Sequence, residues 1–176
     1  MTAYTMFDTA LGPCGLAWTE RGLAAVEVPA GEATEAALRR RIPAPEPTTP
    51  PAPIAALITR IQAHLTGTPD AFTDVPLDPQ DIPDFNRRAY DHIRTITPGE
   101  TTTYGEVAQA LGAPGSAQAV GRAMGRNPYP IVVPCHRVLG ANGKVGGFSA
   151  GAGSVTKLRI LSIEGAAPGG QPSLFD

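Results

Sequence analysis

Apolar and polar positions alternate over the first thirty residues, as they do along β-strands. The alternating stretches are YTMFDTAL, CGLAWTE and LAAVEVP, and Gly-Pro and Arg-Gly pairs stand between them. Glycine and proline favour tight turns, so consecutive strands here are expected to reverse direction. The pattern therefore predicts a three-stranded antiparallel meander.

Helical spacing follows the meander. GEATEAALRRRI carries its acids first and its arginines last, the order that the helix dipole favours, and IAALITRIQAHL repeats apolar residues at helical intervals. The proline-rich segment 44–53 between them is predicted to be an irregular connection. Residues 66–83 are predicted to form a loop with one short strand.

The second half of the chain has a different, mostly helical pattern. DFNRRAYDHIRTI predicts a helix over 84–96, and two shorter helices are expected over 102–111 and 116–126. A GAPG break separates the two short helices, as in a helix-turn-helix.

These elements predict an α+β fold. Residues 1–80 are expected to form an N-terminal α/β domain with a small antiparallel sheet. Residues 81–168 are expected to form a mostly helical domain with a winged-helix-like helix-turn-helix, followed by a flexible tail over 169–176.

Composition and charge refine this interpretation. Hydrophobic residues make up 42% and charged residues 17% of the 176 positions, which is typical of a globular protein. No apolar run reaches the roughly 18 residues of a membrane helix, and the start lacks a secretory pattern, so we expect a cytoplasmic protein. The net charge is −6 over residues 1–85 and +4 over the remainder, which is compatible with a DNA-facing second half.

The helix expected over 116–126 is rich in small residues. Its sequence SAQAVGRAMGRN contains three alanines and two glycines, so its backbone can approach another surface closely. Packing against a neighbouring helix is the commoner reason for this pattern. The alternative is a widened minor groove, held by backbone contacts and by Arg122 and Arg126.

The stretch IVVPCHRVLG places Cys135 directly before His136 and Arg137. Taken alone, Cys135 is either a buried strand cysteine or a nucleophile. Cys14 lies in an alternating strand and is expected in the core, and with no export signal both thiols are expected to be free. The two cysteines and three histidines have no zinc-type spacing, so no metal is predicted, and His64 and His92 are predicted to be surface or packing residues.

Together, NP, PIVVPCHRV and the downstream GGFSA, TK and ILSIEG resemble the O6-alkylguanine-DNA alkyltransferases over residues 84–165. The resemblance implies direct reversal of alkylation damage in double-stranded DNA. The alkyl group of O6-alkylguanine, with O4-alkylthymine as a further candidate, would pass irreversibly to Cys135. The protein would act once per molecule, without a cofactor and as a monomer, in the cytoplasm near the nucleoid.

The resemblance also implies roles for five catalytic residues. A relay would run from Cys135 through water to His136 and Glu164, whose carboxylate orients the imidazole as the acid of a catalytic triad does. Asn127 would support the cysteine loop, and Tyr104 would donate to guanine N3.

Further residues are implied in binding the flipped base and DNA, although Arg137 is also expected to anchor its loop. They are Ala117, Gln118, Arg122, Met124, Arg126, Arg137, Val138, Phe148 and Ser149. Gln118 stands where the family commonly has an arginine that fills the space left by the base, and an amide lacks the charge and stacking plane of arginine. Phe148 stands where a tyrosine is common.

Two rival functions use the same residues. A non-repairing sensor would flip and flag alkylated bases, but proteins of that type replace the cysteine. A thiol hydrolase would use a Cys–His pair, but the sequence offers no separate base for it.

The terminal QPSLFD resembles the short peptides with which bacterial DNA enzymes dock on the replication sliding clamp. Gln171 would enter a polar site, while Leu174 and Phe175 would fill an apolar pocket. The alternative is an apolar tail that folds back onto the domain.

Overall fold

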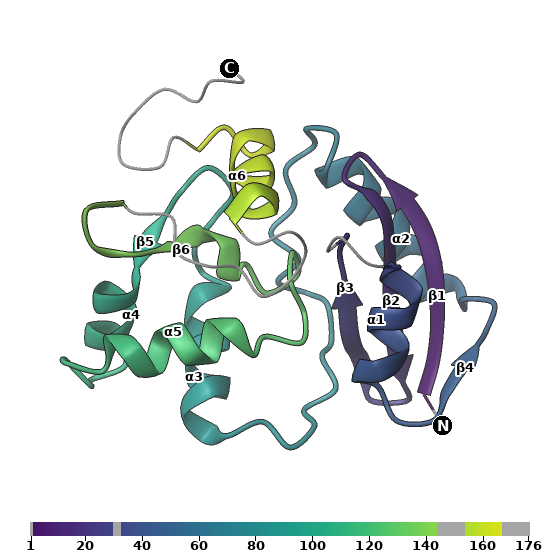
Figure 1. Cartoon of the computed structure of the whole chain (residues 1–176), viewed down its shortest axis with the longest axis horizontal. Coiled ribbons are helices and arrows are strands. Elements are labelled where there is room, and N and C mark those ends of the chain that lie inside the picture. Colours follow the sequence, from purple (N-terminus) through teal and green to yellow (C-terminus); the bar gives the residue numbers. More distant parts are fainter. Residues whose placement is uncertain (1, 30–32, 144–153, 167–176) are drawn as a thin grey trace.

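A four-stranded sheet forms the first half of the molecule in the computed structural model, which describes residues 2–29, 33–143 and 154–166 (Figure 1). β1 (Thr2–Thr9), β2 (Gly12–Thr19) and β3 (Gly22–Glu27) make the predicted antiparallel meander. β4 (Pro45–Pro47) pairs with β1 in parallel and gives the strand order β3-β2-β1-β4. The prediction that 44–53 is wholly irregular is therefore wrong. Proline has no N–H to donate, but it is tolerated in an edge strand at positions where the N–H would face solvent and not the partner strand.

Two helices cover opposite faces of this sheet (Figure 1). α1 (Thr34–Arg41) packs Leu38 against Ala17 and Ala25 on one face. α2 (Ala52–His64) packs Leu57 and Ile61 on the other face, in the main core. Both faces are apolar because the central strand β2 buries successive residues rather than alternate ones.

The second half is mostly helical, and α4 and α5 form the predicted helix-turn-helix pair (Figure 1). The Thr103 hydroxyl caps α4 by accepting from the Glu106 N–H at 3.1 Å. The elements of the second half are α3 (Asp84–Ile93), β5 (Thr102–Thr103), α4 (Tyr104–Ala110), α5 (Ala117–Gly125), the 3₁₀ turn η1 (Cys135–Arg137), β6 (Val138–Leu139), η2 (Ala141–Gly143) and α6 (Ser154–Ile163).

A single hydrophobic core crosses from one half to the other. It includes Leu16 and Ile61 from the first half and Val107, Val133 and Ile160 from the second. The Val26 N–H also donates to the Pro128 carbonyl at 2.9 Å. The boundary near residue 80 stays a prediction, but the two halves do not pack independently of each other.

Among the residues that the structure describes, no helix has both the length and the apolar character needed to cross a bilayer.

Candidate active site

Asn127 shapes the segment that leads to Cys135. Its buried side chain donates to the Val133 carbonyl at 2.9 Å and accepts from the Tyr129 N–H at 2.9 Å. The Val133 N–H also bonds the Tyr129 carbonyl, so the chain turns here. Prolines 128, 130 and 134 favour extended backbone in this segment, but the structure turns there instead. Ile131 has a φ of 76°, which is rare for a β-branched residue and is held by these surrounding contacts.

Cys135 opens the 3₁₀ turn η1, and only 4% of its surface is exposed. Burial raises the pKa of the thiol, whereas a hydrogen bond from Asn127 and the charge of Lys157 act to lower it. The net direction is upward, so the resting thiol is protonated at neutral pH. A thiolate must therefore form by transfer of the proton to a neighbouring base.

Lys157 supplies a positive charge to this site that sequence reasoning missed. It is 1% exposed, and its ammonium donates to the Val138 carbonyl at 2.8 Å. The same ammonium lies 5.9 Å from the centre of the half-buried Tyr104 ring, at the start of α4. Burial, and then the charge of Cys135, raise the pKa of Tyr104, so its hydroxyl keeps a proton to donate.

His136 is the base that the geometry offers. It is fully buried, and its Nε2 lies 2.9 Å from Oε2 of Glu164. A carboxylate only accepts hydrogen bonds, so Nε2 carries the hydrogen and Nδ1 of the neutral ring holds a lone pair. Nδ1 is buried and has no hydrogen-bond partner within the described part of the chain. Burial lowers the pKa of His136 and keeps the resting ring neutral.

The Glu164 side chain is buried and receives donors from three residues. Arg137 reaches both carboxylate oxygens, at 3.0 and 2.6 Å, and His136 and His64 both donate to Oε2. Burial alone would raise the pKa of Glu164, but the hydrogen bonds from His136, His64 and Arg137 hold it well below its usual range. Glu164 is therefore an anion whose charge the site already partly neutralises.

His64 differs from its predicted surface or packing role. It is 1% exposed, and its Nε2 lies 2.8 Å from Oε2 of Glu164, although 100 residues separate the two in the chain. Nothing in the local pattern of α2 points to Glu164, so only the fold could reveal this contact.

Gln118 and Arg122 on α5 and Arg126 at its C-cap are exposed and spaced four residues apart. A Cβ added to Gly121 or Gly125 would meet no atom of the described residues within 4 Å. These glycines therefore do not serve close packing inside the molecule, as the commoner explanation required. At Gly121 the helix backbone lies open to an outside surface.

The remaining sequence-predicted binding residues lie in different surroundings. Ala117 is partly exposed at the start of α5, whereas Met124 and Val138 are buried. Arg137 is also buried and donates to the Ile96 carbonyl at 2.6 Å, so its guanidinium holds the site together from inside. Phe148, Ser149 and the tail residues Gln171, Leu174 and Phe175 lie outside the described residues.

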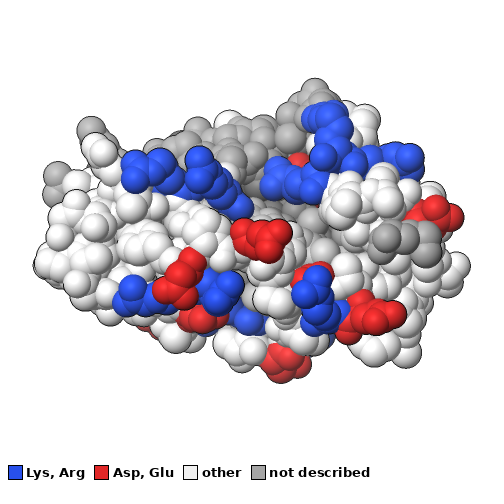
Figure 2. Space-filling view, turned by 90° about the horizontal axis from the view of Figure 1, so that it is seen from below, with Lys and Arg blue, Asp and Glu red and all other residues white. Residues whose placement is uncertain are grey.

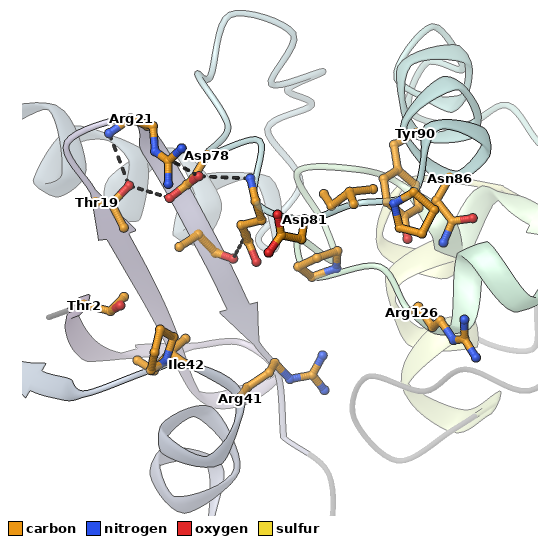
Figure 3. A pocket seen from close by; sticks show the side chains of 16 residues that line it. Thr2, Thr19, Arg21, Arg41, Ile42, Asp78, Asp81, Asn86, Tyr90 and Arg126 are labelled. Carbon is orange, nitrogen blue, oxygen red and sulfur yellow. Dashed lines mark hydrogen bonds and ion pairs between the residues drawn. The ribbon is translucent and has the colours of Figure 1, made fainter.

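A hollow of about 620 Å³ lies between the sheet and α3, with Arg41 and Arg126 on its walls (Figure 3). Neither Cys135 nor His136 lines it, so this hollow is separate from the thiol site. Lys and Arg side chains lie on both halves of the face in Figure 2, with acidic side chains between them. Charge on this face is mixed rather than uniformly basic.

Comparison with known families gives an independent result. Residues 84–166 match the model of the family described as "6-O-methylguanine DNA methyltransferase, DNA binding domain". A methylated-DNA–protein-cysteine methyltransferase of Mycobacterium tuberculosis is 41% identical over 129 residues, which cover 73% of this chain and 76% of the relative. One of Methanosarcina acetivorans is 35% identical over 164 residues, covering 93% and 98%.

Solved structures agree with this result. The crystal structure of the M. tuberculosis O6-methylguanine methyltransferase superposes with a TM-score of 0.76 at 35% identity, over the whole of both chains. The OGT protein of the same organism in complex with DNA also gives a TM-score of 0.76, at 34% identity, covering 93% of this chain and 92% of that one.

Replacing Glu164 with Gln should destabilise the fold by about 3–5 kcal/mol at pH 7, because the buried Arg137 loses its counter-charge. The pKa of Glu164 is lowered in the folded state. The ionised Glu164 therefore contributes its full share of the free energy of unfolding above its ordinary pKa of 4.5. That contribution is lost progressively as the pH falls below this value. Urea unfolding at pH 7 should show this destabilisation for Glu164→Gln and a change within about 0.5 kcal/mol for the control, the exposed Glu20→Gln. A Glu164→Gln variant as stable as the wild type would contradict this assignment.

Proposed function

The chain belongs to the family of methylated-DNA–protein-cysteine methyltransferases, and on that premise we propose that Cys135 accepts the alkyl group of O6-alkylguanine in duplex DNA. As a family member it is a DNA-binding methyltransferase of DNA repair. The observation that carries the proposal is the buried His136, which has Nε2 held by Glu164 and a bare Nδ1 available to a proton. Cys135, His136 and Glu164 thus offer the nucleophile, base and orienting acid of a triad.

Activation of the thiol follows from the protonation states. The proton of Cys135 moves through a bridging water to Nδ1 of His136, and Glu164 stabilises the imidazolium that results. Lys157 and the hydrogen bond from Asn127 stabilise the thiolate. Both ends of the transfer therefore have a counter-charge or a donor, which offsets the cost of creating charge in a buried place.

Transfer itself is a substitution at the alkyl carbon. The sulfur of Cys135 forms a bond to that carbon as the carbon–O6 bond breaks, and the electron pair passes into the guanine. A hydroxyl proton from Tyr104, directed to guanine N3, offsets the developing negative charge. The products are guanine and an alkyl thioether, which water does not cleave under mild conditions. Each molecule then acts once.

Base flipping is part of the proposal because the thiol is only 4% exposed. A reacting carbon must come within about 3–3.5 Å of the sulfur, which a base stacked in a duplex cannot do. Gln118 lies exposed near the start of α5, where its amide can hydrogen-bond the orphaned partner base. It cannot offer the charge or stacking plane of the arginine common in the family, so flipping is expected to be weaker.

The open backbone at Gly121 supports entry of α5 into the minor groove. Gly121 leaves room for the groove wall, and the exposed Arg122 and Arg126 can pair with phosphates.

The remaining parts of the proposal concern assembly. Every group of the relay comes from one chain, which supports action as a monomer. We propose that the protein acts in the cytoplasm, where nucleoid DNA lies. We also propose that the tail binds the replication sliding clamp through Gln171, Leu174 and Phe175, on the strength of the QPSLF sequence.

The repair function is tested by mass spectrometry after incubation with duplex DNA containing O6-methylguanine. One methyl group should appear on the Cys135 peptide, should persist in Cys14→Ser and should be absent from Cys135→Ser. An intact lesion would favour the non-repairing sensor, and product in excess of protein would favour a hydrolase. A second duplex, with O4-methylthymine, decides whether that base is also a substrate.

Replacing Gly121 with Leu should have opposite effects on stability and binding. Leucine is the better helix former by about 0.8 kcal/mol at an exposed helix position, so the melting temperature should rise. The added side chain should weaken DNA binding at least about fivefold, because it separates the backbone from the groove. Fluorescence anisotropy measures the affinity, with the exposed α2 variant Ala56→Leu as control. An unchanged DNA affinity of Gly121→Leu would show that DNA does not bind against this part of α5.

Deleting residues 171–176 should abolish binding to the sliding clamp while leaving methyl transfer unchanged. Surface plasmon resonance on immobilised clamp measures the first effect and the methylation assay the second. Clamp binding that survives the deletion would end this part of the proposal.

A further inference from the structure

We propose that His64 is a positioning residue for methyl transfer, which holds the Glu164 carboxylate against His136 from the opposite half of the chain. The inference rests on the proposed function, since it assigns a role in the same relay. His64 ends α2, whereas Glu164 follows α6 and His136 lies in η1. The contact between His64 and Glu164 therefore connects the N-terminal half to the reactive centre.

The tautomer of His64 is fixed by its two hydrogen bonds. Its Nδ1 accepts from the Asp70 N–H at 3.1 Å, so the hydrogen of the neutral ring must be on Nε2. Nε2 then donates to Oε2 of Glu164 at 2.8 Å. His64 and His136 thus present the same nitrogen to the same oxygen, but only Nδ1 of His64 is already bonded. That difference leaves His136 as the base and makes His64 a fixed donor.

A charged cluster holds the loop that orients His64. Arg60 bonds both oxygens of Asp70, at 2.8 and 2.9 Å, and also pairs with Asp74. The side chain of Asp70 also accepts a hydrogen bond from the Phe72 N–H. The backbone N–H of Asp70 donates to Nδ1 of His64. Phe72 has a φ of 53°, and the centres of its ring and the His64 ring lie 5.4 Å apart in a T-shaped arrangement. The imidazole is therefore fixed by its contact with the Phe72 ring and by the hydrogen bond at Nδ1.

Sharing Glu164 between donors has an electrostatic consequence. Glu164, Arg137 and His64 face His136. Burial lowers the pKa of His136, Glu164 raises it and the charge of Arg137 lowers it. The neutral His64 acts through its hydrogen bond to Glu164, which takes up part of the carboxylate charge. The hydrogen bond from His64 also lowers the pKa of Glu164. Removing this donor would leave more negative charge for His136, so its proton would be held more tightly. His64 is expected to set both the position of the carboxylate and the pH at which His136 becomes a base.

Three substitutions separate donation from packing. His64→Phe keeps a ring but donates nothing to Glu164. His64→Asn can still accept from the Asp70 N–H but is too short to reach the carboxylate. His64→Gln places an amide N–H near the position of Nε2 and should retain the donor. His92→Phe on α3 is the matched control, since His92 lies in a helical last turn and is no part of the relay.

The measurement is the single-turnover rate of methyl transfer to Cys135 from the O6-methylguanine duplex, recorded from pH 5 to pH 9. His64→Phe and His64→Asn should be about tenfold slower on the plateau, the loss expected for a hydrogen bond to a charged group. Their acid limb, which reports protonation of His136, should move to higher pH. His64→Gln and His92→Phe should stay within about threefold of the wild type, with the limb unmoved.

Each outcome decides the inference. If His64→Phe does not fold, the His64→Asn and His64→Gln pair carries the comparison. Wild-type rates and limbs in the donor-free variants would overturn the positioning role, and so would a His64→Gln that is as slow as His64→Asn with no shift of the limb. If the wild type itself leaves Cys135 unmethylated, the proposed function fails instead, and that result is visible before any His64 variant is made.

Discussion

The site depends on one buried carboxylate. Removing a carboxylate from water costs several kcal/mol unless donors replace its hydration, and at Glu164 they come from His64, His136 and Arg137. These residues come from three separate parts of the chain, and the shared hydrophobic core brings them together. The same charge fixes which nitrogen of His136 is free, so folding and proton transfer depend on a common set of contacts.

Cys135 and His136 are both uncharged in the resting site. Burial raises the pKa of the Cys135 thiol and lowers that of His136, so the pair carries no charge until a proton moves between them. Oxidants attack thiolates that are exposed, and a covered, protonated sulfur resists them. That protection suits a residue that reacts once. Asn127, Lys157 and Glu164 are the groups that make the charged state accessible when a substrate arrives.

The sequence predicted what is encoded locally. The meander, the order of the helices and the Thr103 cap follow from period-two and helical spacing, and Cys135, His136 and Glu164 were found because they lie in short motifs. The edge strand β4 was missed because its prolines oppose strand formation, and only pairing with β1 defines it. The contact of His64 with Glu164 was missed for a similar reason: the two meet only through tertiary packing.

Proton transfer from Cys135 requires His136 to be a neutral base with its hydrogen on Nε2. Nitrogen-15 NMR of the histidine rings at neutral pH tests this directly, because a protonated nitrogen and a bare nitrogen resonate far apart. We expect both His136 and His64 to carry hydrogen on Nε2 only, with the Nδ1 signals in the range of an unprotonated nitrogen. A His136 ring that is charged at neutral pH, or that carries its hydrogen on Nδ1, would contradict the account.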